Sequence, residues 1–122
     1  MTEQTGWPLS IWAGLIGIPL MIAGGQALFK LVGTRMPAAD AASMWLMLFD
    51  PYFIAAMVIY AIATVGWILV LRSVPLAAAY SFSALGFLFV PFLSFLLFGE
   101  PLTGRYFAGA VLITAGLAVI HA

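Results

Sequence analysis

The chain has 122 residues, of which 66% are hydrophobic and only 7% charged, and its formal net charge is zero. Soluble domains carry about 25% charged residues, and nucleic-acid binders present basic patches, so composition argues against both classes. Cysteine is absent, which excludes disulfides and thiolate metal sites. The composition is instead typical of a protein embedded in a lipid bilayer.

Four long stretches contain no Lys, Arg, Asp or Glu: residues 4–29, 51–71, 73–99 and 106–122. A helix rises 1.5 Å per residue and needs about 20 apolar residues to cross the hydrocarbon core. The stretches do not alternate apolar with polar residues as barrel strands do. They predict an all-α membrane protein forming a single domain over residues 1–122, with transmembrane helices at about 11–32, 51–71, 76–98 and 105–120.

The connection after the first predicted helix is the only long one. Residues 38–49 mix Asp40 and Ser43 with large apolar side chains, which suits a short helix lying in the membrane interface. An early start of the second transmembrane helix is the equally good alternative. Asp50 and Pro51 are residue types that cap and begin a helix, and the later connections, 72–75 and 99–104, are short and rich in turn residues.

Two polar residues on the first predicted helix are candidates for function. Gln26 and Lys30 are one turn apart and therefore share a face. The amide of Gln26 suits either a hydrogen bond to a neighbouring helix or a polar substrate. Lys30 suits either snorkelling to the interface or contact with a phosphate or carboxylate.

Further candidates lie on the second and third predicted helices. Arg72, at a helix end, is an interfacial anchor or a contact for an anionic head group. Tyr80 and Ser83 begin the third helix and offer hydroxyl groups. A stripe of larger side chains on the second helix either packs or lines a pocket; it consists of Tyr60, Thr64 and Trp67.

The sequence offers no constellation typical of an enzyme. No acidic residue falls deep inside a predicted helix, although an intramembrane carboxylate is the usual proton carrier of a pump. His121 is the only histidine, so a metal site is not expected, and neither a phosphate-binding glycine loop nor a nucleophile triad is present. We expect a protein that is not an enzyme and uses no cofactor.

Several motifs, taken together and in order, resemble the drug/metabolite transporter superfamily, in particular its four-helix EamA-like and small multidrug resistance members. These motifs are Asp50-Pro-Tyr52, Trp67 to Leu76 with Arg72-Ser-Val-Pro75, Ala79-Tyr80, Phe98-Gly-Glu-Pro-Leu102 and Gly109 to Gly116. Gly25-Gln26 followed by Lys30 is similar to a pattern of the small flippase subunits for aminoarabinose-linked undecaprenyl phosphate.

The resemblance implies a multi-pass protein of the bacterial inner membrane that dimerises into an eight-helix bundle. It implies a central cavity between the first three helices and a dimer seam on the fourth, which we place at Gly109, Leu112 and Gly116. Small residues on one face of a membrane helix favour such contacts. The second subunit is expected to be another copy or a paralogue.

Departures from the family pattern narrow the expected substrate. The drug exporters resembled here carry a glutamate eight residues before the lysine, where this chain has Ile22, and a tryptophan where it has Ser83. Proton-coupled export of aromatic cations is therefore not favoured. We predict a flippase for polyprenyl-phosphate-linked sugar, such as an aminosugar, with substrate-binding residues Gln26, Lys30, Arg72, Tyr80 and Ser83. Alternatives are an exporter of small hydrophobic or cationic molecules, and a non-transporting structural or regulatory membrane subunit.

Overall fold

The computed structural model describes residues 7–122; the first six residues of the predicted domain lie outside the described part. Its helices are α1 (Leu9–Arg35), α2 (Ala41–Met47), α3 (Pro51–Leu71), α4 (Leu76–Ser81), the 3₁₀ turn η1 (Phe82–Leu85), α5 (Gly86–Phe98) and α6 (Gly104–Ile120). Within residues 7–122 every regular element is helical, so the all-α expectation is confirmed there.

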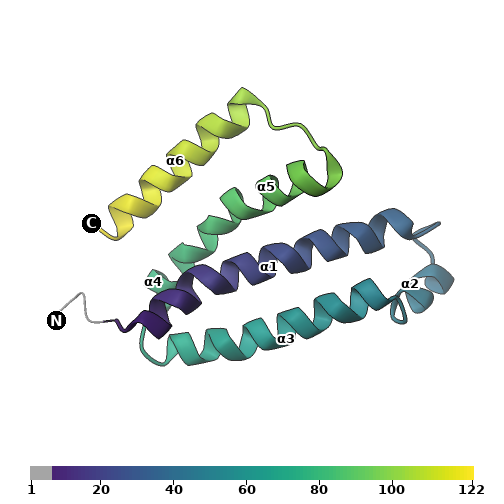
Figure 1. The fold of residues 1–122 in the computed structure, drawn as a ribbon, viewed down its shortest axis with the longest axis horizontal. Coiled ribbons are helices and arrows are strands. Elements are labelled where there is room, and N and C mark those ends of the chain that lie inside the picture. Colours follow the sequence, from purple (N-terminus) through teal and green to yellow (C-terminus); the bar gives the residue numbers. More distant parts are fainter. Residues whose placement is uncertain (1–6) are drawn as a thin grey trace.

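The helices form an up-and-down arrangement with α1 in the middle. In Figure 1, α3 lies on one side of α1 and α5 on the other, while α6 packs outside α5. Both described chain ends lie at one end of the molecule, and α2 and the α5–α6 turn lie at the other. Hence α1 reaches both α3 and α5, and α6 is attached only along the α4–α5 side.

Three segments in the described residues are long and apolar enough to cross a membrane: Leu9–Arg35, Pro51–Leu71 and Leu76–Phe98. The fourth apolar helix, Gly104–Ile120, has 17 residues, a length of roughly 26 Å at 1.5 Å per residue. Large apolar side chains cover the outside of all of them; Leu112, for example, is 73% exposed. Such a surface is stable only against lipid or another protein.

The best-packed region lies between the first half of α1, the second half of α3 and the α4–η1 segment. Leu15 is fully buried, and Ile18, Ala63, Val70 and Phe82 join it in one cluster. Gly14 allows this approach, since a Cβ there would stand 2.6 Å from Cγ2 of Val70. The core therefore fixes the α1–α3 pair at the end where the chain enters α1.

Side-chain caps define the ends of several helices. Asp40 accepts a hydrogen bond of 2.8 Å from the amide of Ser43, and Asp50 accepts one of 2.8 Å from the amide of Tyr52. The bond from Ser43 holds the pKa of the Asp40 carboxyl below its ordinary value. Residues 41–47 thus form a helix of their own, α2, separate from α3. Thr103 accepts from the amide of Tyr106 at the start of α6.

The segment expected as one helix over residues 76–98 contains a 3₁₀ turn at Phe82–Leu85. The Ser81 hydroxyl donates to the carbonyl of Ala78 at 2.6 Å, and the amide of Phe82 bonds the carbonyl of Ala79, three residues earlier. A hydroxyl that takes a backbone carbonyl competes with the α-helical bond at that position. The expected single helix is therefore divided into α4, the 3₁₀ turn and α5.

Pro91 leaves a gap in the hydrogen bonding of α5 that α6 fills. Proline has no amide hydrogen for the carbonyl four residues earlier, which here belongs to Phe87. The Tyr106 hydroxyl donates to that carbonyl from α6. This bond is one of the few polar links between α6 and the rest of the described chain.

We expect Tyr106→Phe to lower the free energy of unfolding in detergent by about 1–2 kcal/mol, because it leaves the Phe87 carbonyl, in an apolar membrane-spanning segment, without a donor. In a protein that already carries Pro91→Ala, Tyr106→Phe should lower the free energy of unfolding by less, since the alanine amide can bond the Phe87 carbonyl itself. Chemical denaturation of the four proteins in this cycle measures both effects. Equal losses in the two backgrounds would contradict the compensation.

Candidate functional site, an internal cavity with a charged end

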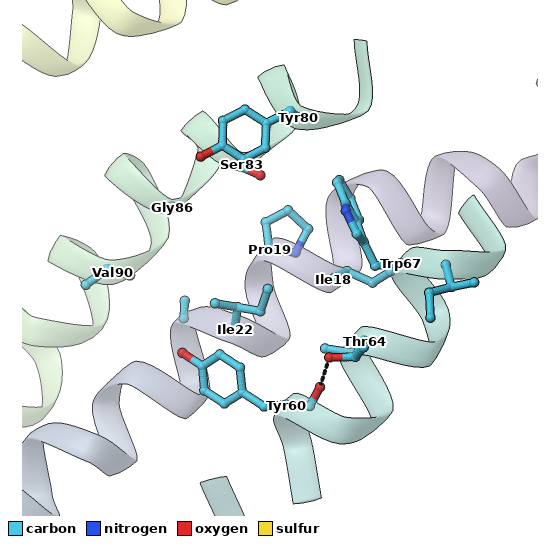
Figure 2. Close-up of a pocket in the computed structure, with 13 residues that line it drawn as sticks. Ile18, Pro19, Ile22, Tyr60, Thr64, Trp67, Tyr80, Ser83, Gly86 and Val90 are labelled. Carbon is cyan, nitrogen blue, oxygen red and sulfur yellow. Dashed lines mark hydrogen bonds between the residues drawn. The ribbon is translucent and has the colours of Figure 1, made fainter. Parts of the chain in front are cut away.

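A cavity of about 300 Å³ opens between α1, α3 and the α4–α5 segment. Figure 2 shows Pro19 and Ile22 on α1 facing Tyr80 and Ser83 across the space, with Tyr60, Thr64 and Trp67 along α3. The walls are mainly apolar and aromatic, and hydroxyl groups supply the polar contacts. The stripe on α3, left open between packing and lining by the sequence, thus lines a cavity.

A second cavity of about 210 Å³, with more polar side chains in its lining, adjoins the first. The two share Ala23 and Val90 in their walls. The second extends toward the end of the bundle that carries α2, and its polar lining comes from α1, from α5 and from the turn that follows α5. Those polar residues are Gln26, Lys30, Ser94 and Glu100. The two adjoining cavities, called the path below, are lined mainly by apolar side chains in the first and carry charged groups at the far end of the second.

Tyr60 lines the first cavity and bonds Gln26, which lines the second. Its hydroxyl accepts a hydrogen bond of 2.6 Å from the Gln26 amide, and its ring stacks on Phe29 with 5.2 Å between centroids. The ring edge lies directly on Gly25, where a Cβ would stand 2.6 Å from Cε2 of Tyr60. The Gly25-Gln26 pair therefore positions Tyr60: the glycine makes room for the ring, and the glutamine amide donates a hydrogen bond to its hydroxyl.

An ion pair lies at the charged end. Nζ of Lys30 is 3.4 Å from Oε2 of Glu100, and the two side chains are 52% and 47% exposed. The Ser94 hydroxyl donates to Oε1 of the same carboxylate. The bond from Ser94, and then the partner Lys30, hold the pKa of Glu100 below its ordinary value. The carboxylate is therefore ionised at neutral pH.

Glu100 owes its position to the end of α5. Gly99 adopts a left-handed conformation with φ of 65°, its amide bonds the Phe95 carbonyl, and the Glu100 amide reaches back to the Ser94 carbonyl. This is the usual glycine termination of a helix. It turns the chain so that the Glu100 side chain points back toward α1.

The structure brings together four of the five predicted substrate-binding residues. Tyr80 and Ser83 line the first cavity, and Gln26 and Lys30 line the second. Arg72 does not join them: it caps the far end of α3 and borders a separate cavity with Ser10. Ser10 and Lys30 are roughly 30 Å apart along α1, so Arg72 and Lys30 cannot hold the same phosphate at one time.

Sequence reasoning missed Glu100 and Ser94 as site residues. A signal for Glu100 was present, because the connections that follow the first and third helices of an up-and-down bundle lie on the same side. A lysine at the end of one helix and a glutamate after the other were thus placed to meet. Nothing in the sequence selected Ser94 from the other serines.

The three residues of the predicted dimer seam are spaced three and four residues apart and lie on one face of α6, which also reaches the edge of a crevice. Gly116 borders a crevice of about 430 Å³ between α6 and the α4–α5 segment, while Leu112 points outward. At the end of α6, Nε2 of His121 lies 2.6 Å from the Ser81 hydroxyl and the ring packs on Phe82. No group of three or more His, Cys, Asp or Glu side chains suited to a metal ion occurs in the part of the chain that the structure describes.

The fold and the cavities define a small multi-pass helical membrane protein with two adjoining cavities beside α1. Comparison with known proteins identifies the family. The chain is 32% identical over 108 residues to a probable 4-amino-4-deoxy-L-arabinose-phosphoundecaprenol flippase subunit, ArnE, of Pseudomonas paraeruginosa, covering 87% of this chain and 92% of that protein. The ArnE of Escherichia fergusonii is 31% identical over 114 residues, 90% and 96% of the two chains.

ArnF, the other flippase subunit of that name, is also similar: the Pseudomonas fluorescens protein is 30% identical over 121 residues, covering 90% of this chain and 86% of its own. The chain belongs to this family of small flippase subunits. No family model matches it, and no solved structure does. With its apolar helices, membership makes it a multi-pass protein of the bacterial inner membrane. The relatives' names describe transport subunits and not enzymes.

Proposed function

We propose that this chain is one subunit of a dimeric transporter that flips a polyprenyl-phosphate-linked sugar, of the aminosugar type, across the inner membrane. The observation that carries the proposal is the pair of adjoining cavities, apolar beside Trp67 and charged at Lys30. A lipid-linked sugar has the same division between an apolar tail and a charged head. The names of the relatives point to the same substrate class.

The predicted residues take separate roles in this scheme. The polyprenyl tail stays in lipid, while the sugar passes the hydroxyl and amide groups of Tyr80, Ser83 and Gln26. Lys30 contacts the phosphate at one side of the membrane, and Arg72, at the opposite end of the bundle, contacts it at the other. Two basic groups at opposite ends suit a head group that starts at one face and finishes at the other.

The second subunit completes the bundle in this proposal. All four apolar helices span the membrane, and α6 provides the seam. The outer face of α6 is open, with Leu112 and Val119 exposed, and a Cβ added at Gly109 or Gly116 would meet no atom of this chain within 4 Å. The partner that packs there is a second copy or, as ArnE and ArnF suggest, a paralogue.

The test is binding of undecaprenyl phosphate and its glycosides to the purified protein in lipid nanodiscs. We expect Lys30→Ala to weaken binding about tenfold, which corresponds to the loss of one charge-assisted hydrogen bond. We expect Arg72→Ala to weaken binding of the phosphate at the opposite end of the bundle. Arg35→Ala is the matched control, because Arg35 pairs with Asp50 outside the cavity. Unchanged binding in both Lys30→Ala and Arg72→Ala would remove the proposed site.

Export of small organic cations is the second candidate, since aromatic side chains line the cavity and Glu100 lies at its charged end. A proton-coupled exporter needs a carboxylate that protonates during turnover. Ser94 and Lys30 lower the pKa of Glu100, which opposes that role. Exchange of protons for an organic cation by reconstituted protein would favour export. A protein that moves no labelled lipid or cation in vesicles would instead fit a structural subunit.

A further inference from the structure

The charged end of the path presents one positive and one negative group to the same cavity. Lys30 and Glu100 both line it, and about half of each side chain remains exposed. From α1, Gln26 lies one turn before Lys30, and from α5, Ser94 donates to the oxygen of Glu100 that Lys30 does not contact. The carboxylate thus has a second contact that does not depend on Lys30.

We propose that Lys30 and Glu100 divide between them a zwitterionic head group, with Lys30 binding the phosphate and Glu100 binding the ammonium of an aminosugar. This inference rests on the proposed function and adds a residue, Glu100, that selects the amine. In a phosphate-linked 4-amino-4-deoxy sugar, the two charges stand on opposite sides of one ring. They cannot neutralise each other, so two separate protein charges are needed.

A second ion pair at the same end of the bundle shows what distinguishes the first. Arg35 lies 3.5 Å from Asp50, whose side chain is only 15% exposed. Asp50 also caps α3 through the Tyr52 amide, and Arg35 lies over the Tyr52 ring. Those charges are committed to holding α1 against α3, and neither residue lines a cavity described above.

In the part of the chain that the structure describes, the Lys30–Glu100 pair does not cap a helix or lie over an aromatic ring in this way. Within residues 7–122, the contacts of the Glu100 carboxylate are the one from Lys30 and the one from Ser94, and neither caps a helix. A half-exposed ion pair contributes little stability, so opening it costs little. A ligand that brings both opposite charges replaces each lost contact with a new one. A phosphate linked to an uncharged sugar would pair with Lys30 but leave the Glu100 carboxylate without a cation.

The experiment compares two probes that differ in one group: polyprenyl phosphate carrying 4-amino-4-deoxyarabinose, and the same lipid carrying arabinose with a hydroxyl at that carbon. Binding is measured in nanodiscs at pH 7. We expect the unsubstituted protein to prefer the amine about tenfold, as one charge-assisted contact allows. Glu100→Gln should bind both probes equally, and should bind the hydroxyl probe at least as tightly as the unsubstituted protein does, because no carboxylate is then left without a cation. Lys30→Met should weaken both probes and keep the preference.

Asp50→Asn is the matched control, because it removes a carboxylate at the same end of the bundle while an asparagine can still cap α3; it should leave both affinities and their ratio unchanged. A Glu100→Gln protein that still prefers the amine overturns the inference and leaves the proposed function standing. If the unsubstituted protein binds neither probe, the proposed function fails, and the inference fails with it.

Discussion

Gly25→Ala is expected to weaken substrate binding tenfold or more and to destabilise the α1–α3 pair. The new methyl carbon would stand 2.6 Å from Cε2 and 3.1 Å from Cδ2 of Tyr60, well inside van der Waals contact. The ring cannot retreat along its own plane without losing its stack on Phe29. As it moves, the Tyr60 hydroxyl leaves the Gln26 amide, and the junction between the two cavities changes shape.

The net cost of Gly25→Ala combines two opposite effects. Overpacking in a tight interface costs about 1–3 kcal/mol, while alanine favours the helix over glycine by up to about 1 kcal/mol. We expect a net loss of stability in detergent and a fall in binding of tenfold or more in nanodiscs.

Gly24→Ala provides the control for helix propensity, since a Cβ at Gly24 meets nothing within 4 Å. It should keep binding and gain slightly in stability. Equal behaviour of the two alanine variants would contradict the role given to Gly25. A Gly25→Ala protein that recovers binding when Tyr60 is also changed to a smaller residue would locate the fault at the ring.

Leu15→Ala is expected to give the largest loss of stability among apolar truncations on α1. Leu15 is fully buried in the cluster that joins α1 to α3 and to the α4–η1 segment. In water such a change costs about 2–5 kcal/mol, part of it from lost transfer energy and part from the cavity left behind. In lipid the transfer part largely disappears, because the acyl chains are as apolar as leucine. We therefore expect about 1–3 kcal/mol.

The neighbouring Ile16 is the natural control, because it is 48% exposed in this chain. Ile16→Ala removes a similar apolar volume but opens no cavity, so its cost should lie near zero. Thermal unfolding of both variants in the same detergent measures the difference. Comparable losses in Leu15→Ala and Ile16→Ala would mean that the helices are held together by something other than this packing.

Some residues of the candidate site could be predicted from the sequence, and others could not. The Gly-Gln-x-x-x-Lys pattern drew attention to Gln26 and Lys30, and both line the second cavity. The residues that contact Gln26 and Lys30 could not be predicted from any local sequence pattern. Tyr60 lies 34 residues after Gln26, and its stripe on α3 fitted packing as well as lining. Arg72 resembled Lys30 as a basic residue at a helix end, yet the alternation of helix direction places it at the opposite end of the bundle.

The apolar stretches and the caps follow from the sequence itself. Charge-free runs long enough to cross lipid must satisfy their backbone hydrogen bonds internally, so helices are the outcome whatever their neighbours are. Asp50, Thr103 and Gly99 then end or begin those helices through contacts a few residues away. Only the tertiary structure decided that Glu100 meets Lys30, that Tyr60 rests on Gly25 and that Tyr106 bonds the carbonyl freed by Pro91. Each of these contacts joins different helices, and the rotation and depth of one helix against another are set by side-chain packing that no single helix encodes.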